Sequence, residues 1–278
     1  MAKLGLGAAI AALMFVGSAE ASTTMPLDTG YNYLIFGPYG IPPNLSSSVT
    51  DQYWIKIASY EPPLSAVTVA PAFVLNPALT SPPWAPLFAP AVDRWIGAKS
   101  NTLSAPGVSQ YTPGYSIYRK CFCLMAGYKN PSISINRVRA DDDVQVWLNS
   151  VRFTLLGPVS GAWWNTPGLT VPTNNNPQLF RVGRNCLYVL VEDRIGHTGF
   201  TLTGSVTADG LMPAAASGVE MNFKPCDCPP AQPGTPGTPG AAVEPEADGA
   251  AMLKQIVRIA ERRRSDALRS LLTIAPRP

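Results

Sequence analysis

The chain has 278 residues and a formal net charge of +3, with 46% hydrophobic but only 14% charged residues. This balance is sufficient for a hydrophobic core, and it excludes a chain that is disordered throughout. The 29 prolines and 23 glycines favour many short strands joined by turns over a helical protein. The length fits one all-β domain with extensions at its ends.

The first 21 residues have the three parts of a secretory signal peptide. Lys3 supplies a positive charge, residues 4–17 form an apolar run, and Ala19-Glu20-Ala21 is a small-x-small cleavage site before Ser22. The apolar run is too short and wrongly flanked for a membrane anchor. We predict that the mature protein begins at Ser22 and is secreted, to the extracellular space or the cell surface.

Residues 22–223 are predicted to form one domain of strands and turns. In its early part, Trp54 and Trp95 stand in the apolar surroundings that are typical of core positions. Residues 71–90 are too rich in proline for a central strand and are predicted to form a long surface loop.

Four later segments alternate apolar residues with others, as half-buried strands do. Asp, Asn and Gly residues, which favour turns, separate these segments. The segments are 118–124, 140–149, 182–191 and 198–206.

This order of strands and turns resembles the galactose-binding-domain-like jelly-roll family. The resemblance covers about residues 30–208 and implies an all-β, jelly-roll β-sandwich. The chain departs from the family pattern at Asn149-Ser150, where the family usually has Asn-Gly in a hairpin turn. Sugar-binding modules, accessory domains of glycosidases and purely structural surface domains all share this fold, so the function stays open. The motifs that carry the resemblance are Asp51-x-x-Trp54, Trp95-Ile96-Gly97, Tyr118-Arg119-Lys120-x-Phe122 and Ala140-Asp141-Asp142.

The five cysteines of an exported chain are expected to pair, which leaves one over. Cys121 and Cys123 share one face of a predicted strand, and Cys186 points away from the apolar residues of another. If these strands are neighbours, as in the related jelly rolls, all three thiols lie on the outer face. We expect a bridge from Cys121 or Cys123 to Cys186, with the remaining one bonded to Cys226 or Cys228. The alternative is that all five thiols are reduced.

Four residues are candidates for binding a glycan or a cell-surface polysaccharide. Sugars stack on aromatic side chains while their hydroxyl groups bond polar ones. Two adjacent tryptophans between predicted strands cannot easily both face the core, and Trp147 shares a strand face with polar residues. For Trp147, packing in the core or on the sheet face is the favoured interpretation, because related domains often carry a packing aromatic at this place. The candidates are Trp163, Trp164, Asn165 and Trp147.

The acidic run Asp141-Asp142-Asp143 enters a predicted strand. Clustered carboxylates suit Ca²⁺, and a carboxylate pair can also act as general acid and base. The third interpretation is a turn, which is the role that the related domains imply. We predict no cofactor beyond, at most, a structural calcium ion at these three residues.

The sequence contains no catalytic signature. Its one histidine, His197, lies in a glycine turn, which argues against a zinc site or a Ser-His-Asp triad. Gly-x-Ser-x-Gly, P-loop and dinucleotide motifs are absent. We therefore predict no catalytic residues and no enzyme.

Two C-terminal segments follow the predicted domain. Residues 224–247 read as a Cys/Pro/Gly linker with three Gly-X-Y triplets, too few for a stable collagen triple helix. Residues 248–278 are predicted to form a basic amphipathic helix that ends at Pro276. Its heptad seam consists of Leu253, Val257, Ala260, Arg264, Ala267 and Leu271.

The basic charge of the chain belongs to this helix, because residues 248–278 carry a net charge of +4. The rest is nearly neutral, so no nucleic-acid partner is expected. The helix has three interpretations: a seam packed under a solvated face, self-association into a homo-oligomer, or contact with a membrane surface. Two functions follow from the sequence. One is a secreted, non-catalytic carbohydrate-binding module, and the other is a structural component of an extracellular assembly, held by the helix and the linker cysteines.

Overall fold

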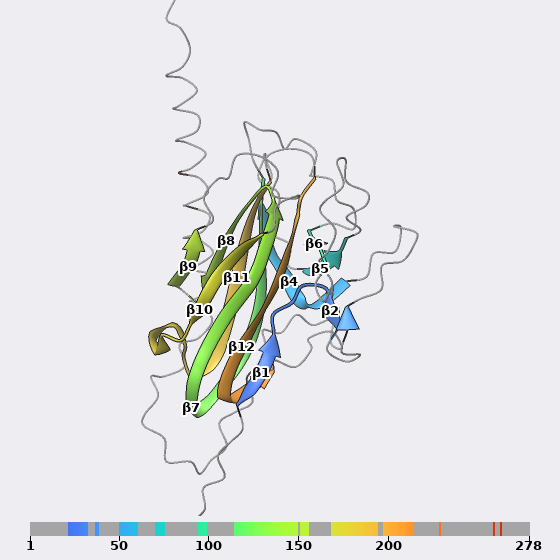
Figure 1. Cartoon of the computed structure of the whole chain (residues 1–278). Helices are drawn as coiled ribbons and strands as arrows, with labels where there is room; N and C mark the ends of the chain where they lie inside the picture. Colours follow the sequence, from blue (N-terminus) through green and yellow to red (C-terminus); the bar gives the residue numbers. More distant parts are fainter. Residues whose placement is uncertain are drawn as a thin grey trace, which may run out of the picture.

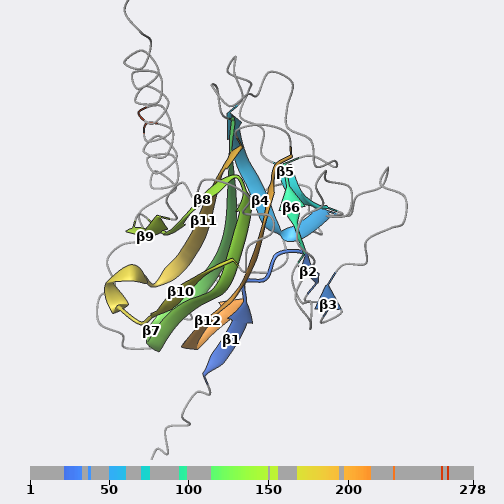
Figure 2. The same cartoon turned by 45° about the horizontal axis from the view of Figure 1, so that its top comes forward.

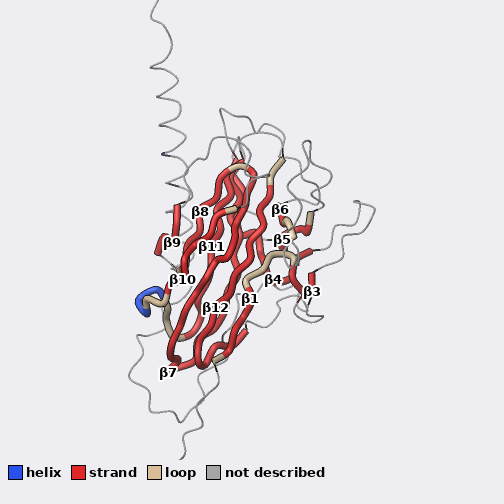
Figure 3. Tube along the Cα trace, viewed as in Figure 1, coloured by secondary structure: helices blue, strands red, loops and turns tan. Residues whose placement is uncertain are grey.

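The computed structural model describes residues 22–32, 37–38, 50–60, 70–75, 94–98, 114–149, 151–155, 168–193 and 197–213, together with Cys228, Arg258 and Arg262. Almost all of the described residues lie in strands or in the turns between them (Figure 3). The early strands are β1 (Thr23–Pro26), β2 (Tyr31–Asn32), β3 (Gly37–Pro38), β4 (Thr50–Tyr60), β5 (Ala70–Val74) and β6 (Ile96–Gly97). The later elements are β7 (Gly114–Asp141), β8 (Asp143–Leu148), β9 (Val151–Leu155), β10 (Leu169–Asn174), the 3₁₀ turn η4 (Pro177–Leu179), β11 (Gly183–Asp193) and β12 (Gly199–Pro213).

In the described part of the chain, ten strands form one antiparallel sheet. Their order is β1-β12-β6-β5-β4-β7-β11-β8-β9, and β10 pairs with β7. Strands β2 and β3 form a separate two-stranded sheet. Figure 1 shows the long strands β7 and β12 running side by side through the centre of the domain.

Strand β7 belongs to both layers of the domain. Its first part, residues 114–124, pairs with β11, and its second part, residues 132–141, pairs with β12. Between the two parts, Gly127 and Asn130 have φ angles of 81° and 51°, values that glycine and asparagine tolerate best. The register with β12 also shifts there, on both sides of Asp209. The sheet therefore folds over on itself at this end (Figure 2).

The two layers enclose the main hydrophobic core of the described residues, and Leu75 and Trp95 form a separate buried cluster. Tyr118 and Phe122 from the first part of β7 lie in the same buried cluster as Ile133 and Ile135 from its second part. The ring centroids of Tyr118 and Phe200 are 4.8 Å apart. The prediction of an all-β, antiparallel sandwich is thus confirmed, because alternate residues of each strand meet across the layers.

The interpretation of two tryptophans as core residues is confirmed, since Trp54 and Trp95 are fully buried. The predicted loop at residues 71–90 is wrong at its start. Strand β5 covers residues 70–74 and buries Ala72 and Val74 in the core. Pro71 is tolerated there because it stands next to the first residue of the strand, where a missing N–H costs little.

Several predictions fall outside the described residues: the signal peptide, the linker apart from Cys228, and the helix apart from Arg258 and Arg262. These two arginines have helical backbone and are exposed. Among the described residues, no helix has the length and apolar character needed to cross a bilayer.

Candidate functional site

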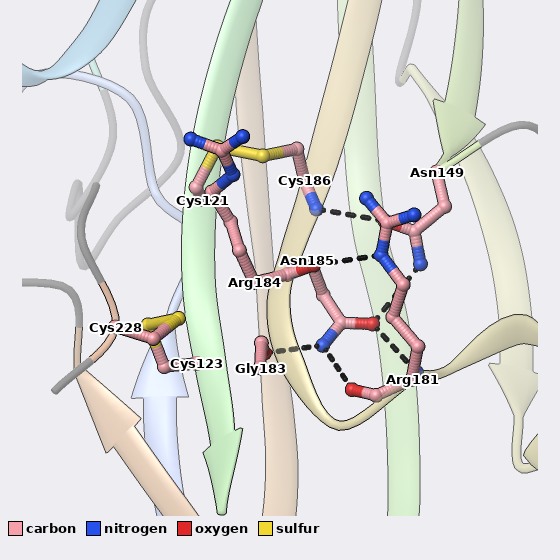
Figure 4. Close-up of a disulfide and its surroundings, with 9 residues drawn as sticks. All are labelled: Cys121, Cys123, Asn149, Arg181, Gly183, Arg184, Asn185, Cys186 and Cys228. Atoms are coloured by element: carbon pink, nitrogen blue, oxygen red, sulfur yellow. Dashed lines mark hydrogen bonds between the residues drawn. A yellow bond between two sulfur atoms is a disulfide. The ribbon is translucent and has the colours of Figure 1, made fainter. Parts of the chain in front are cut away.

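Two disulfide bonds join residues that are distant in the sequence. Cys121 on β7 stands directly opposite Cys186 on β11, and the two are bonded. Cys123 is bonded to Cys228, which lies beyond the last strand (Figure 4). The predicted pairing is confirmed, including the neighbouring strands on which it depended. Disulfides of this kind are typical of an oxidising compartment.

The cysteines lie on the face of the sheet opposite to the core, which we call the far face. The sequence predicts this direction correctly, because Leu187, Val189 and Val191 alternate with Cys186 and lie in the core. The far face is nevertheless buried. Its members include Ile117, Cys121, Trp147, Cys186, Tyr188 and Leu190, each less than 8% exposed.

Burial of the far face decides between the two interpretations of Trp147. Its side chain is only 3% exposed, so the ring offers no open face for a sugar to stack on. It stands opposite Tyr188 on β11. In this structure Trp147 is a packing residue rather than a binding platform.

An asparagine network fastens the start of β11 to the neighbouring hairpin (Figure 4). The side-chain oxygen of Asn185 accepts hydrogen bonds from Nδ2 of Asn149 at 3.0 Å and from the main chain of Arg181 at 2.9 Å. Nδ2 of Asn185 donates to the carbonyls of Arg181 and Gly183. Asn185 is fully buried, so these bonds satisfy its amide.

Asn149 occupies the turn at which the sequence departs from the family pattern. Its φ angle of 52° is in the left-handed region, which asparagine tolerates better than most residues. The side chain also accepts from the main chain of Cys186 at 3.0 Å and donates to the carbonyl of Leu179 at 2.9 Å. Asn149 therefore ties the turn, η4 and β11 together next to the first disulfide.

A buried lysine and two aspartates form a second polar cluster, on the core side of the sheet. Lys120 is 3% exposed and lies between Tyr118 and Phe122 on the core face of β7. Its Nζ atom is 3.5 Å from the main-chain oxygen of Asp28 and 5.7 Å from the ring centroids of Tyr53 and Trp54. This cluster was not predicted from the sequence, although the alternation that places Tyr118 and Phe122 inside also places Lys120 there.

Asp51 supplies the counter-charge and is fully buried. Its carboxylate accepts hydrogen bonds from the main-chain N–H groups of Gly30 at 2.6 Å, Tyr53 at 2.9 Å and Trp54 at 3.1 Å. Burial raises the pKa of Asp51, while the charge of Lys120 and these N–H groups lower it. The carboxylate thereby holds residue 30 of the N-terminal segment against the beginning of β4.

Asp28 attaches the same segment to β12. Its Oδ1 atom accepts from the main chain of Gly204 at 3.0 Å, and the indole of Trp54 donates to the carbonyl of Leu27 at 3.1 Å. Burial lowers the pKa of Lys120 to about 8, although the charges of Asp51 and Asp28 raise it. We interpret the cluster as a fastening of residues 27–30 to β4, β7 and β12.

The acidic run lies where β7 ends and β8 begins. Asp141 and Asp142 are half-buried and Asp143 is 2% exposed. Within the described ranges, no group of three or more His, Cys, Asp or Glu side chains is arranged to hold a metal ion. Calcium binding at these aspartates stays a prediction, and their arrangement gives it no support.

The remaining site predictions lie outside the described residues. They are Trp163, Trp164, Asn165, Cys226 and the heptad seam Leu253, Val257, Ala260, Arg264, Ala267 and Leu271. The structure describes the strands on either side of the segment with the two tryptophans. Residues 156–168 connect β9, at the end of the order of strands in the sheet, to β10, which pairs with the second part of β7.

Two solved structures are distantly similar to the chain. One is the PA14 domain of the MpAFP antifreeze protein, with 18% identity over 40% of this chain and 46% of that chain, at a TM-score of 0.22. The other is a family 35 carbohydrate-binding module from an environmental isolate, with 15% identity over 41% of this chain and 81% of that chain, at a TM-score of 0.24. The chain thus spans about half the length of the first structure. No protein-family model and no curated protein matches the chain.

Proposed function

We propose that the chain is a secreted, non-catalytic carbohydrate-binding module built on a galactose-binding-domain-like jelly roll. The architecture supports the proposal, since a rigid sandwich is a common scaffold on which loops present binding residues. The two disulfides support export, because such bonds persist in oxidising compartments.

One observation carries the proposal: Trp163, Trp164 and Asn165 stand together in the connection between β9 and β10. The core of the described strands contains other large side chains, Trp54, Trp95, Tyr118, Phe122 and Phe200 among them. Two more adjacent indoles, next to an amide, fit an apolar platform with a polar edge, which is what a sugar ring requires. Trp147 has no part in this platform because it is buried.

Replacing either Trp163 or Trp164 by alanine is expected to weaken glycan binding by about 1–3 kcal/mol, the scale of one lost aromatic anchor. The melting temperature is expected to change little, because neither indole is assigned to the core. Titration calorimetry with a polysaccharide that the wild type binds measures the loss of affinity, and thermal unfolding measures the change in melting temperature. Trp54→Ala is the matched control, and it is expected to cost about 3–5 kcal/mol of stability because Trp54 is fully buried. A similar loss of stability in Trp163→Ala and Trp164→Ala would make these residues part of the core.

A second function, a component of an extracellular assembly, is favoured by the disulfide pattern. The two bonds use four of the five cysteines, so Cys226 has no cysteine left to pair with in its own chain. It stands two residues before Cys228, whose bond to Cys123 holds this part of the chain on the sandwich. In a secreted protein, a leftover cysteine is either a free thiol or pairs with a thiol of another molecule, and the second case is the one that an assembly requires.

If this function holds, the exported protein is expected to run as a covalent dimer on a non-reducing gel. Cys226→Ser is expected to convert it fully to monomer, since both disulfides within the chain remain. Removing residues 248–278 instead tests the predicted helix, and its loss is expected to lower the mass measured in solution under reducing conditions. A wild-type protein that is monomeric under both conditions would exclude the assembly function.

A further inference from the structure

Two exposed apolar side chains lie next to each other where the sheet folds over. Among the described residues, Met125 and Val182 are the large hydrophobic side chains with high exposure, at 42% and 37%. Leu124 on β7 stands opposite Gly183 on β11. Met125 follows Leu124 and Val182 precedes Gly183, so these two residues lie directly beyond the last pair of that register.

The backbone around this pair is open. A Cβ atom added to Gly127 or Gly183 would meet no atom within 4 Å. A Cβ atom added to Gly210 would lie 3.6 Å from Cβ of Met125 and 3.8 Å from Cβ of Tyr128, so these two side chains flank that glycine. We call Met125, Tyr128 and Val182 the apolar tip.

Positive charge surrounds the tip. Lys129 and Arg181 are exposed and Arg184 is half-buried, while residues 121–130 and 176–185 contain no acidic residue. The nearest acidic residue on the facing strand is Asp209, opposite Lys129, and its carboxylate accepts a hydrogen bond from Asn130 at 2.9 Å.

The arginines stand behind the tip rather than on it. Figure 4 shows the side chain of Arg184 turning back from Gly183 toward Cys121, and that of Arg181 turning back toward Asn149. Nε of Arg181 donates to the main-chain oxygen of Arg184 at 2.8 Å, which fixes this direction.

The C-terminal tail is attached at the same end of the domain. Cys228 is bonded to Cys123, which is two residues from Met125. The chain that leads to the basic helix therefore starts close to the tip. Arg258 and Arg262, one helical turn apart in that helix, are both exposed.

We propose that the apolar tip docks on an anionic lipid surface, with Met125 and Val182 at the boundary between headgroups and acyl chains and Lys129, Arg181 and Arg184 facing the phosphates. An apolar contact backed by cations matches the layering of a membrane interface, in which the headgroup charge lies outside the hydrocarbon. The exposed members of the tip, Met125 and Val182, have no ring, and the ring of Tyr128 is partly buried against the core, so lipid fits this surface better than a glycan.

The test uses the full mature chain, with both disulfides, in sedimentation with vesicles. Phosphatidylcholine mixed with phosphatidylglycerol is compared with phosphatidylcholine alone, and binding is expected only to the mixed vesicles. Met125→Glu/Val182→Glu is expected to weaken binding at least about tenfold, through lost apolar contact and added repulsion. Asn136→Glu/Thr173→Glu adds the same charge at exposed positions on β7 and β10, away from the tip, and is expected to have a much smaller effect.

A second variant keeps the proposal testable if the first one fails to fold. Lys129→Gln/Arg181→Gln is expected to lower affinity for the mixed vesicles about tenfold or more, since each cation near such a surface contributes about fivefold. Three results would overturn the proposal. They are no binding to mixed vesicles, equal losses in the Met125→Glu/Val182→Glu and Asn136→Glu/Thr173→Glu variants, or a wild-type dimer that Met125→Glu/Val182→Glu turns into a monomer. The last result would make the tip an interface between copies of the chain.

Discussion

Replacing Cys121 and Cys186 together by alanine is expected to lower the free energy of unfolding by about 4 kcal/mol. The bond closes a sequence separation of 65 residues, and in the chain-entropy model a loop of that length restricts the unfolded chain by roughly this amount. For a domain of this size the melting temperature should fall by about 10 °C. Chemical denaturation and calorimetry of the oxidised proteins measure both quantities.

The control for this variant is Cys226→Ser, which removes a thiol but leaves both disulfides in place. Its free energy of unfolding is expected to equal that of the wild-type monomer. Peptide mapping without reduction should recover the Cys121–Cys186 and Cys123–Cys228 pairs in both the wild type and Cys226→Ser. A free, alkylatable Cys186 in the wild type would contradict the pairing of β7 with β11.

Lys120→Met is expected to lower the free energy of unfolding by about 3–5 kcal/mol. The change leaves the fully buried carboxylate of Asp51 without its nearby cation, and removal of one partner from a buried charge pair costs this much. Arg119→Met is the matched control. Arg119 precedes Lys120 on β7, points to the opposite face and is half-buried, so its loss is expected to cost less than about 1 kcal/mol.

The dependence of stability on pH gives a second measurement of the same cluster. The pKa of Lys120 is about 8 in the folded chain and 10.5 when the group is solvated, so the unfolded chain binds more protons between these pH values. The contribution of Lys120 to stability therefore rises with pH across this window. The Lys120→Met variant should lack this rise. If the free energy of unfolding of the wild type and of the variant changed with pH in the same way, Lys120 would be solvated in the folded chain and the interpretation of the cluster would be wrong.

Alternation along the strands placed the cysteines on one face, and the resemblance to jelly rolls supplied the neighbouring strands, but the choice between Cys121 and Cys123 as partner of Cys186 stayed open until the structure showed it. Cys121 and Cys186 each alternate with core residues, so both had to point away from the core. Alternation does not show whether that face is covered, so the packing of Trp147, favoured from the sequence, was established only by its burial in the structure. Exposure depends on segments that approach from elsewhere in the chain.

Other features needed contacts between distant segments. Four alternating segments do not reveal that one strand runs from Gly114 to Asp141 and serves both layers. The bend in β7 at which the sheet folds over requires positive φ angles at Gly127 and Asn130. This requirement arises from the pairing of β7 with its neighbouring strands and is not visible in the sequence. The position of Lys120 on the core face could be predicted from the alternation. Its burial is stabilised by Asp28 and Asp51, which lie far from it in the sequence, and these contacts could not be predicted.

The candidate site was predictable only in its residue types. The pairing of adjacent tryptophans with an asparagine is visible in the sequence, whereas their position between β9 and β10 required the order of strands in the sheet. Residues of the apolar tip were not predicted as a site. Met125 and Val182 are distant in the sequence, and only the pairing of Leu124 with Gly183 makes them neighbours.

A glycan array tests the central proposal, carbohydrate binding through the connection between β9 and β10, most directly. The chain beginning at Ser22, with its disulfides formed, is compared with the Trp163→Ala/Trp164→Ala variant at equal concentration. We expect the wild type to bind a defined set of glycans and the variant to lose that signal while keeping its melting temperature. An array on which the wild type binds nothing, or on which both proteins bind the same glycans equally, would contradict the proposal.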